Sequence, residues 1–227
     1  MTRPRETFDR ELQRLQDEIL ALGSMVENAL TESVEVLKRR DFEGSRRLIA
    51  QDRTINEKRF AIETDALILI ATQQPMARDV RTLAAVLELS TELERIGDYA
   101  KGIARINLMI GEAPLVKPLI DIPRMAEKAR SMLHRALDAF VRGDVDLARA
   151  IPAEDEEVDA LYNQVYRELM TFIMADPRHI DQASYLLWVA HNLERAADRV
   201  TNICERIIFT VTGEMKELDV EEGLEDQ

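Results

Sequence analysis

Hydrophobic residues in the first forty positions recur at alternating spacings of four and three. This spacing keeps apolar side chains on one face of an α-helix. The first such series contains Phe8, Leu12, Leu15, Ile19, Leu22, Val26 and Ala29, and it predicts a helix that reaches about Arg40. Asp41 can cap a second helix, which the Gln-Gln-Pro sequence at 73–75 ends. A third helix is expected over 76–109.

The segment 111–123 (GEAPLVKPLIDIP) contains a glycine and three prolines, and is typical of a linker. Three further helical patterns follow it. Their apolar stripes are Met125, Ala129, Met132, Ala136 and Phe140; Val158, Leu161, Val165, Leu169 and Phe172; and Leu186, Val189, Leu193, Ala196, Val200, Ile203 and Ile207. We expect domains at 1–112 and 124–213, a linker at 113–123, and an acidic, disordered tail at 214–227.

The two halves of the chain are related as an internal repeat. Asp41 matches Asp144, Asp52 matches Asp155 and Ile55 matches Val158, each 103 positions later, whereas Glu94 and Asp98 match Glu194 and Asp198 after 100 positions. The sequence therefore predicts an all-α protein of six helices, arranged as two tandem, pseudo-symmetric three-helix bundles joined end to end. A one-domain array of six helices is the alternative.

Composition and charge narrow the classes of function. The net charge of −13 and the lack of a basic stripe argue against nucleic acid as a partner. Cys204 is the only cysteine, so an internal disulfide is excluded, and we expect it to be buried. The sequence has no apolar run of the ~18 residues that cross a bilayer, and 1–10 lack a signal-peptide core. We expect a soluble, cytoplasmic protein.

The sequence Leu-Glu-Arg-x-x-Asp occurs twice, at 93–98 and 193–198. On a helical wheel the polar residues around the second copy form one column outside the apolar stripe: His191, Glu194, Asp198, Asn202 and Glu205. Asp155 and Asp159 lie on the preceding helix, where they could converge with this column. Carboxylate oxygens from two helices suit a metal ion or a phosphate-bridged metal site.

Carboxylates spaced in this way are also common as solvated surface residues, so the spacing alone does not decide the matter. The repetition of Asp52, Glu94 and Asp98 in the first half favours a functional role. That first copy is poorer in anionic donors. Asn56, Thr91, Gly102 and Arg105 stand where the second half has Asp159, His191, Asn202 and Glu205. We therefore expect weaker cation binding by the first half.

Two segments, QQPMARDVRTLAAVLELSTELERIGDYA at 73–100 and NLERAADRVTNICERI at 192–207, closely resemble the PhoU family of accessory regulators of phosphate transport. The resemblance covers nearly the whole chain except the tail. It implies tandem three-helix bundles that bind iron or zinc clusters on their outer faces. It carries the ligand role over to Asp52, Glu94 and Asp98, and to Asp155, Asp159, Glu194, Asp198 and Asn202. Asn56 and Gly102 depart from the family pattern, which puts the first cluster in doubt.

The same resemblance implies a function without catalysis. It implies a cytoplasmic adaptor between the ATPase subunit of a phosphate ABC transporter and a phosphate-sensing histidine kinase, which represses both when phosphate is plentiful. Such a protein would reach the membrane only through its partners. From the residues alone, manganese or magnesium would also suit oxygen-rich sites, and a homodimer is the default assembly. A carboxylate-bridged helical metalloenzyme and a metal-free scaffold are the alternatives.

Overall fold

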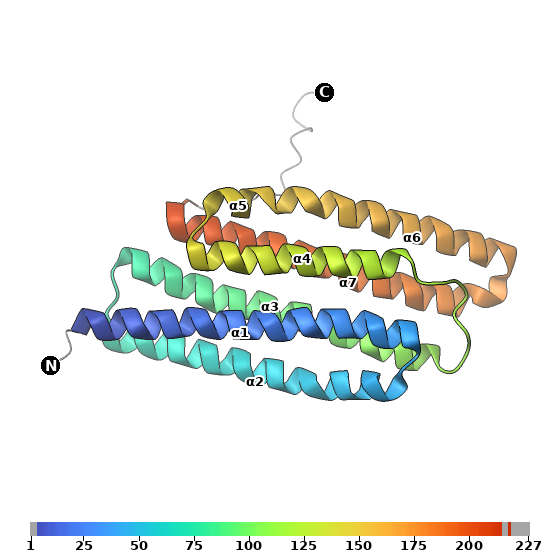
Figure 1. Ribbon diagram of the computed structural model, residues 1–227, viewed down its shortest axis with the longest axis horizontal. Helices are drawn as coiled ribbons and strands as arrows, with labels where there is room; N and C mark the ends of the chain where they lie inside the picture. Colours follow the sequence, from blue (N-terminus) through green and yellow to red (C-terminus); the bar gives the residue numbers. More distant parts are fainter. Residues whose placement is uncertain (1–3, 215–217, 219–227) are drawn as a thin grey trace, which may run out of the picture.

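The computed structural model describes residues 4–214 and residue 218, and all the regular elements in this part of the chain are helical. Its six long helices are α1 (Pro4–Arg39), α2 (Phe42–Gln73), α3 (Ala77–Ile110), α4 (Asp121–Arg142), α6 (Asp155–Ala175) and α7 (Ile180–Thr212). Three short ones complete the described elements: α5 (Val145–Ala150), η1 (Pro152–Glu154) and η2 (Pro177–His179). The predicted all-α class with six principal helices is confirmed (Figure 1).

The repeat extends to the geometry of the turns. Asp41 caps α2 by accepting a 2.7 Å hydrogen bond from the backbone N–H of Gly44. Asp144 caps α5 in the same way, with a 3.0 Å bond from Leu147. The residue before each cap has a positive φ, 57° at Arg40 and 64° at Gly143. Glycine adopts this conformation without steric cost.

The first half holds its non-glycine turn residue in place with a buried asparagine. The guanidinium of Arg40 donates to Oδ1 of Asn107 and to the backbone carbonyl of Gly111. Nδ2 of Asn107 donates to the carbonyl of Val36 at 3.1 Å and to Oγ of Ser45 at 2.8 Å. Asn107 therefore ties α3 to the α1–α2 turn.

The second half differs from the first in two places. Pro152 interrupts the counterpart of α2, which becomes α5, η1 and α6, because proline cannot donate the backbone hydrogen bond of a helix interior. Helix α4 begins at Asp121, so residues 121–123 of the expected linker are helical. Pro123 is accommodated because the N–H groups of a first helical turn have no partner within the helix.

The two three-helix units lie side by side, which corrects the expected end-to-end arrangement (Figure 1). Helices α1, α2 and α3 form one unit, and α4, α6 and α7 form the other. The most extensive contact between the units is that of α3 with α7, and α1 also packs against α4. A Cβ added to Gly23 on α1 would overlap Cδ1 of Leu137 on α4, which shows how closely these two helices approach.

Buried hydrophobic residues of both units belong to one continuous cluster within the described chain. The reason is that α3 and α7 are apolar over more than one stripe. Ala196 and Ala197 are both buried although consecutive helical residues point about 100° apart. The second face of α7 carries small residues such as Ala190, Thr201 and Cys204. A search for large apolar residues at heptad spacing overlooks such a face.

The contacts of Asn107 yield a test of this fold. Replacing Asn107 with Ala removes the partner of Ser45 and of the Val36 carbonyl in a fully buried place. We expect the free energy of unfolding, measured by urea denaturation, to fall by about 2–3 kcal/mol. The control is Asn28→Ala on the exposed face of α1, which should change it by less than about 0.5 kcal/mol. Equal losses in the two variants would contradict the proposed role of Asn107.

Candidate functional site

The predicted carboxylates of the second half lie along the line where α6 packs against α7, a surface that we call the α6/α7 groove. Nδ1 of His191 lies 3.0 Å from Oε2 of Glu194. Burial raises the pKa of Glu194, the neighbouring charges of Asp198 and Asp159 raise it further, and His191 acts in the opposite direction. These effects place Asp159 of α6 beside Glu194 and Asp198 of α7. The structure thus brings four of the predicted residues together across one helix pair.

Three more residues lie at the rim of this α6/α7 groove. Asp155 lies one turn before Asp159 in the first turn of α6, and its Oδ1 is buried. The ring of Tyr162 lies 6.3 Å from the ring of His191. Nε of Arg195 approaches Oδ2 of Asp198 to 3.5 Å.

The donors of the α6/α7 groove fit a divalent cation by their chemistry. The candidate ligands comprise four carboxylates and one imidazole, and carboxylate oxygen with imidazole nitrogen is a donor set for magnesium, manganese, iron or zinc. Within the described residues, no three Asp, Glu, His or Cys side chains stand in a ligating arrangement for one ion. Binding would therefore require rotation of side chains, and the metal itself stays a prediction.

Asn202 and Glu205 lie elsewhere. Nδ2 of Asn202 donates a 3.3 Å hydrogen bond to Oε2 of Glu92, across the contact between α3 and α7. Glu205 accepts a 2.8 Å hydrogen bond from the backbone N–H of Leu218. Both line a cavity of about 360 Å³ with Glu88, Thr91, Glu92 and Arg206. With a rise of about 1.5 Å per residue, Glu205 is about 16 Å along the helix from Glu194. The structure does not bring these two residues to Glu194.

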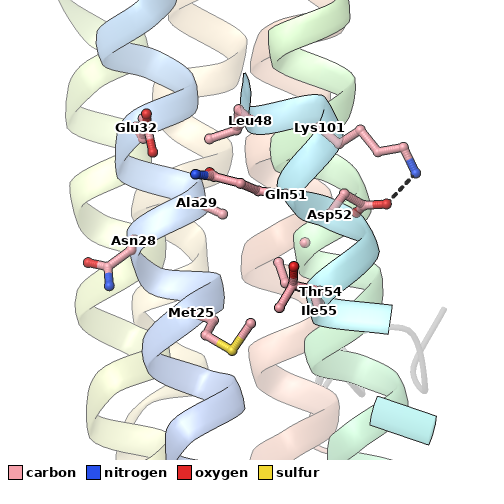
Figure 2. Close-up of a pocket in the computed structure, with 11 residues that line it drawn as sticks. Met25, Asn28, Ala29, Glu32, Leu48, Gln51, Asp52, Thr54, Ile55 and Lys101 are labelled. Carbon is pink, nitrogen blue, oxygen red and sulfur yellow. Dashed lines mark hydrogen bonds and ion pairs between the residues drawn. The ribbon is translucent and has the colours of Figure 1, made fainter. Parts of the chain in front are cut away.

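The first half places Asp52, Glu94 and Asp98 together in the equivalent α2/α3 groove, but around a lysine. Nζ of Lys101 lies 2.6 Å from Oδ2 of Asp52 and 3.0 Å from Oδ1 of Asp98 (the first contact is drawn in Figure 2). Nδ2 of Asn56 also donates to Oδ2 of Asp52, at 3.1 Å. Burial and the charge of Asp98 raise the pKa of Glu94, and Arg59 lowers it. The ammonium group stands where a metal ion would be expected.

Lys101 and Arg59 are functional residues that the sequence analysis missed. Extending the overlay of the two halves would have found them, since Lys101 matches Thr201 after 100 positions and Arg59 matches Tyr162 after 103. The first half therefore has two cations where the second has neutral side chains. The α2/α3 groove as it stands does not fit a metal ion.

Gly102 has a packing role that its place in the overlay did not reveal. A Cβ there would lie 3.1 Å from Oδ1 of Asn192, so Gly102 permits the close approach of α7 to α3. Asn202 makes its contact with Glu92 at the pseudo-symmetric position of the same helix pair. The difference between Gly102 and Asn202 therefore changes the contact between α3 and α7 as well as the set of side chains that could bind a metal ion.

Fold and site together define a class of protein. It is a tandem repeat of two three-helix bundles, which pack side by side mainly through α3 and α7, and each bundle carries a cluster of carboxylates on its surface. None of the described helices combines the length and the hydropathy that crossing a bilayer requires. The family model of the PhoU domain matches residues 19–106 and again residues 122–207. The chain belongs to the PhoU domain family.

Relatives share both the sequence and the fold over most of their length. The chain is 39% identical over 210 residues to the phosphate-specific transport system accessory protein PhoU homolog of Caulobacter vibrioides, covering 92% of this chain and 91% of the relative. It is 35% identical over 207 residues to the Escherichia coli (strain K12) phosphate-specific transport system accessory protein PhoU, covering 91% and 86%. The crystal structure of the phosphate transport system regulatory protein PhoU from Streptococcus pneumoniae superposes with a TM-score of 0.85 at 32% identity, covering 92% and 99%.

The role of Lys101 can be tested through stability. Replacing Lys101 with Met leaves the buried carboxylate of Asp52 without its cation, and we expect the free energy of unfolding at pH 7 to fall by about 2–3 kcal/mol. The hydrogen bond to Asp52 is the main cause of the raised pKa of Lys101. Its contribution is therefore full below the ordinary lysine pKa of about 10.4 and is lost as pH rises through the folded-state value.

The matched control is Lys38→Met, which removes an exposed pair with Glu35 and should cost less than about 0.5 kcal/mol. Urea denaturation at pH 7 and above pH 10 measures both variants. A Lys101 variant as stable as the control at pH 7 would show that the ammonium does not stabilise the groove.

In metal-free protein, ionised Glu194 should lower the free energy of unfolding, whereas Lys101 raises it. Because its pKa is raised by burial, Asp198 and Asp159, its ionised form destabilises the fold above the folded-state pKa. This cost fades as pH falls through that value towards the ordinary pKa of about 4.3. We expect Glu194→Gln to raise the free energy of unfolding at pH 7 in the presence of EDTA, and the gain to vanish below about pH 4.

Glu156→Gln, on the exposed side of α6, is the control and should leave stability unchanged at both pH values. Thermal unfolding monitored by circular dichroism is sufficient to compare them. A metal-free Glu194→Gln protein that is less stable than the parent at pH 7 would contradict the prediction that ionised Glu194 destabilises the fold.

Proposed function

We propose that this protein is a negative regulator of phosphate uptake and of the phosphate-starvation response. It would act as an adaptor between the ATPase subunit of a phosphate ABC transporter and a phosphate-sensing histidine kinase, repressing both when phosphate is plentiful. The observation that carries the proposal is the match of both halves to the PhoU domain. Relatives over nearly the whole chain are named accessory proteins of a phosphate-specific transport system.

The proposed setting is cytoplasmic, with the membrane reached only through the partners and with a homodimer as the working assembly. No catalytic step is part of the proposal, in keeping with relatives named for accessory and regulatory roles. The candidate ligands also lie at the surface rather than inside a bundle core. Asp159 is exposed, and 53% of the His191 side chain is accessible. In carboxylate-bridged helical metalloenzymes the ligands instead project into the core.

Metal binding is proposed for the α6/α7 groove. Asp155, Asp159, Glu194 and Asp198 would hold the ion, with His191 as an additional donor, and iron or zinc are the proposed metals. A cation bound there would offset the negative charge that raises the pKa of Glu194 and would link α6 to α7. For the α2/α3 groove we propose that Lys101 supplies this positive charge instead.

The regulatory proposal is tested by deletion. A strain lacking this protein should keep a reporter of the phosphate-starvation response switched on in phosphate-rich medium, and a plasmid-borne copy should restore repression. Binding of the purified protein to the transporter ATPase subunit or to the kinase should weaken as salt rises, because the chain has a net charge of −13. Normal repression in the deletion strain, in a genome without a second gene of this family, would refute the adaptor role.

A further inference from the structure

A cavity of about 340 Å³ opens between α1 and α2, with α3 as its floor (Figure 2). We call it the α1/α2 pocket. Its apolar lining consists of Met25, Ala29, Leu48, Ile55 and Gly97; its polar lining consists of Asn28, Glu32, Gln51, Asp52, Thr54 and Lys101. Asn28, Gln51 and Thr54 are exposed, so the pocket is reached from solvent. It lies on the outer side of the first unit, away from the contact between α3 and α7.

The second unit shows what the equivalent place holds. The two segments that match the PhoU domain begin 103 residues apart, at 19 and 122, and the same offset relates the turn residues Arg40 and Gly143. Applied to the α1/α2 pocket, this offset pairs Met25 with Lys128, Glu32 with Arg135, Gln51 with Glu154, and Thr54 with Glu157. Helices α4 and α6 therefore provide a direct structural comparison for α1 and α2.

Cations of the chain itself occupy the place in the second unit. Nζ of Lys128 lies 2.8 Å from Glu154 and 3.0 Å from Glu157. The guanidinium of Arg135 also pairs with Glu154. These two basic side chains bridge α4 to the start of α6. In the first unit their positions are taken by Met25 and Glu32, so the described residues contain no counterpart of these two ion pairs.

Some apolar side chains around the α1/α2 pocket are smaller than their counterparts in the second unit. Ala29 stands where the second unit has Met132, which is fully buried, and Gly97 stands where it has Ala197. A Cβ at Gly97 would lie 3.2 Å from Cδ1 of Ile55. The absence of this atom leaves space beside Ile55 at the floor of the pocket. The second unit has a cavity of its own between α4 and α6, and its lining includes Lys128 and Glu157. The two units therefore differ here in the basic and apolar side chains that line the cavity, and both are open to solvent.

The α1/α2 pocket also contains a buried hydrogen-bond acceptor for which the described residues supply no donor. Asp52 is only 6% exposed, and its Oδ1 has no hydrogen-bond donor among the described residues. Its other oxygen is held by Lys101, which Asp98 shares. A buried acceptor without a donor is unfavourable, because burial has removed its hydrogen bonds with water. With Glu32 on the wall of the same pocket, the lining has more negative charge than Lys101 offsets.

We propose that the α1/α2 pocket receives an arginine side chain presented by a helix of a partner protein. The aliphatic stem would pack on Met25, Ala29 and Ile55, and the guanidinium would donate to Glu32 and to Oδ1 of Asp52. Arginine suits the pocket better than lysine because its donors are fixed in a planar fork and it is less strongly hydrated. The net charge of −13 favours approach of a basic partner. The inference goes beyond the phosphate-regulatory role and does not require it.

The test uses the full chain in EDTA and a fluorescent, alanine-based helical peptide with one central arginine. A peptide with citrulline in place of the arginine has the same shape without the charge. Fluorescence anisotropy at low salt should show binding of the arginine peptide and at least about tenfold weaker binding of the citrulline peptide. Glu32→Gln should also weaken binding of the arginine peptide about tenfold.

Two variants block the pocket by copying the second unit. Ala29→Met fills the apolar volume as Met132 does, and Met25→Lys with Gln51→Glu recreates the pair of Lys128 and Glu154. Each should lower the affinity for the arginine peptide at least about tenfold. Ala21→Met, an exposed position on the same helix, is the matched control and should bind like the parent. Urea denaturation shows which blocking variants are folded.

Three results would overturn the inference: equal binding of the citrulline peptide, parental affinity in a folded blocking variant, or no binding of the arginine peptide at all. Free agmatine, which has the guanidinium without a protein backbone, separates a docking site from a small-cation site. Agmatine should compete much more weakly than the peptide. Competition at the peptide's own affinity would show that the pocket serves a free cation, contrary to the proposal.

Discussion

The antiparallel packing of α3 against α7 is the contact on which the rest of the structure depends. Small residues make it possible: Gly102 admits Asn192, and Asn202 meets Glu92 on the other side of the crossing. Each of these helices completes the core of its own unit with one face and contacts the other unit with a second. The remaining face carries the Glu-x-x-x-Asp pair towards α2 or α6. The positions of both carboxylate grooves therefore follow from this single helix pair.

The two units share this scaffold, but their basic side chains form ion pairs between different pairs of helices. In the first unit Lys101 bridges the carboxylates between α2 and α3, and the α1/α2 pocket has no cation in place of Lys128. In the second unit Lys128 and Arg135 form ion pairs between α4 and the start of α6, and Arg195 and His191 lie beside carboxylates of the α6/α7 groove. The two units thus carry these basic side chains between different pairs of helices.

Much of this could be predicted from the sequence, because helices and their caps depend on local patterns. The capping roles of Asp41 and Asp144 follow from such patterns, as does the meeting of Glu94 and Asp98 with Asp52. The side-by-side packing could not be predicted from the sequence, because the second face of α7 is built from small residues that also occur on exposed helices. The helical wheel grouped Asn202 and Glu205 with Glu194 because it records angle and ignores the rise along the axis. Lys101 was overlooked because its counterpart, Thr201, was not among the candidate ligands that were compared.

The central claim is that the α6/α7 groove, rather than the α2/α3 groove, is the cation site of this protein. It is tested most directly by measuring bound metal after loading with iron(II) or zinc and removing the excess. Asp155→Ala combined with Asp198→Ala should lose most of the metal and stay folded. Asp52→Ala combined with Asp98→Ala should retain the metal content of the parent. Unchanged metal in the first double variant, or loss confined to the second, would contradict the account.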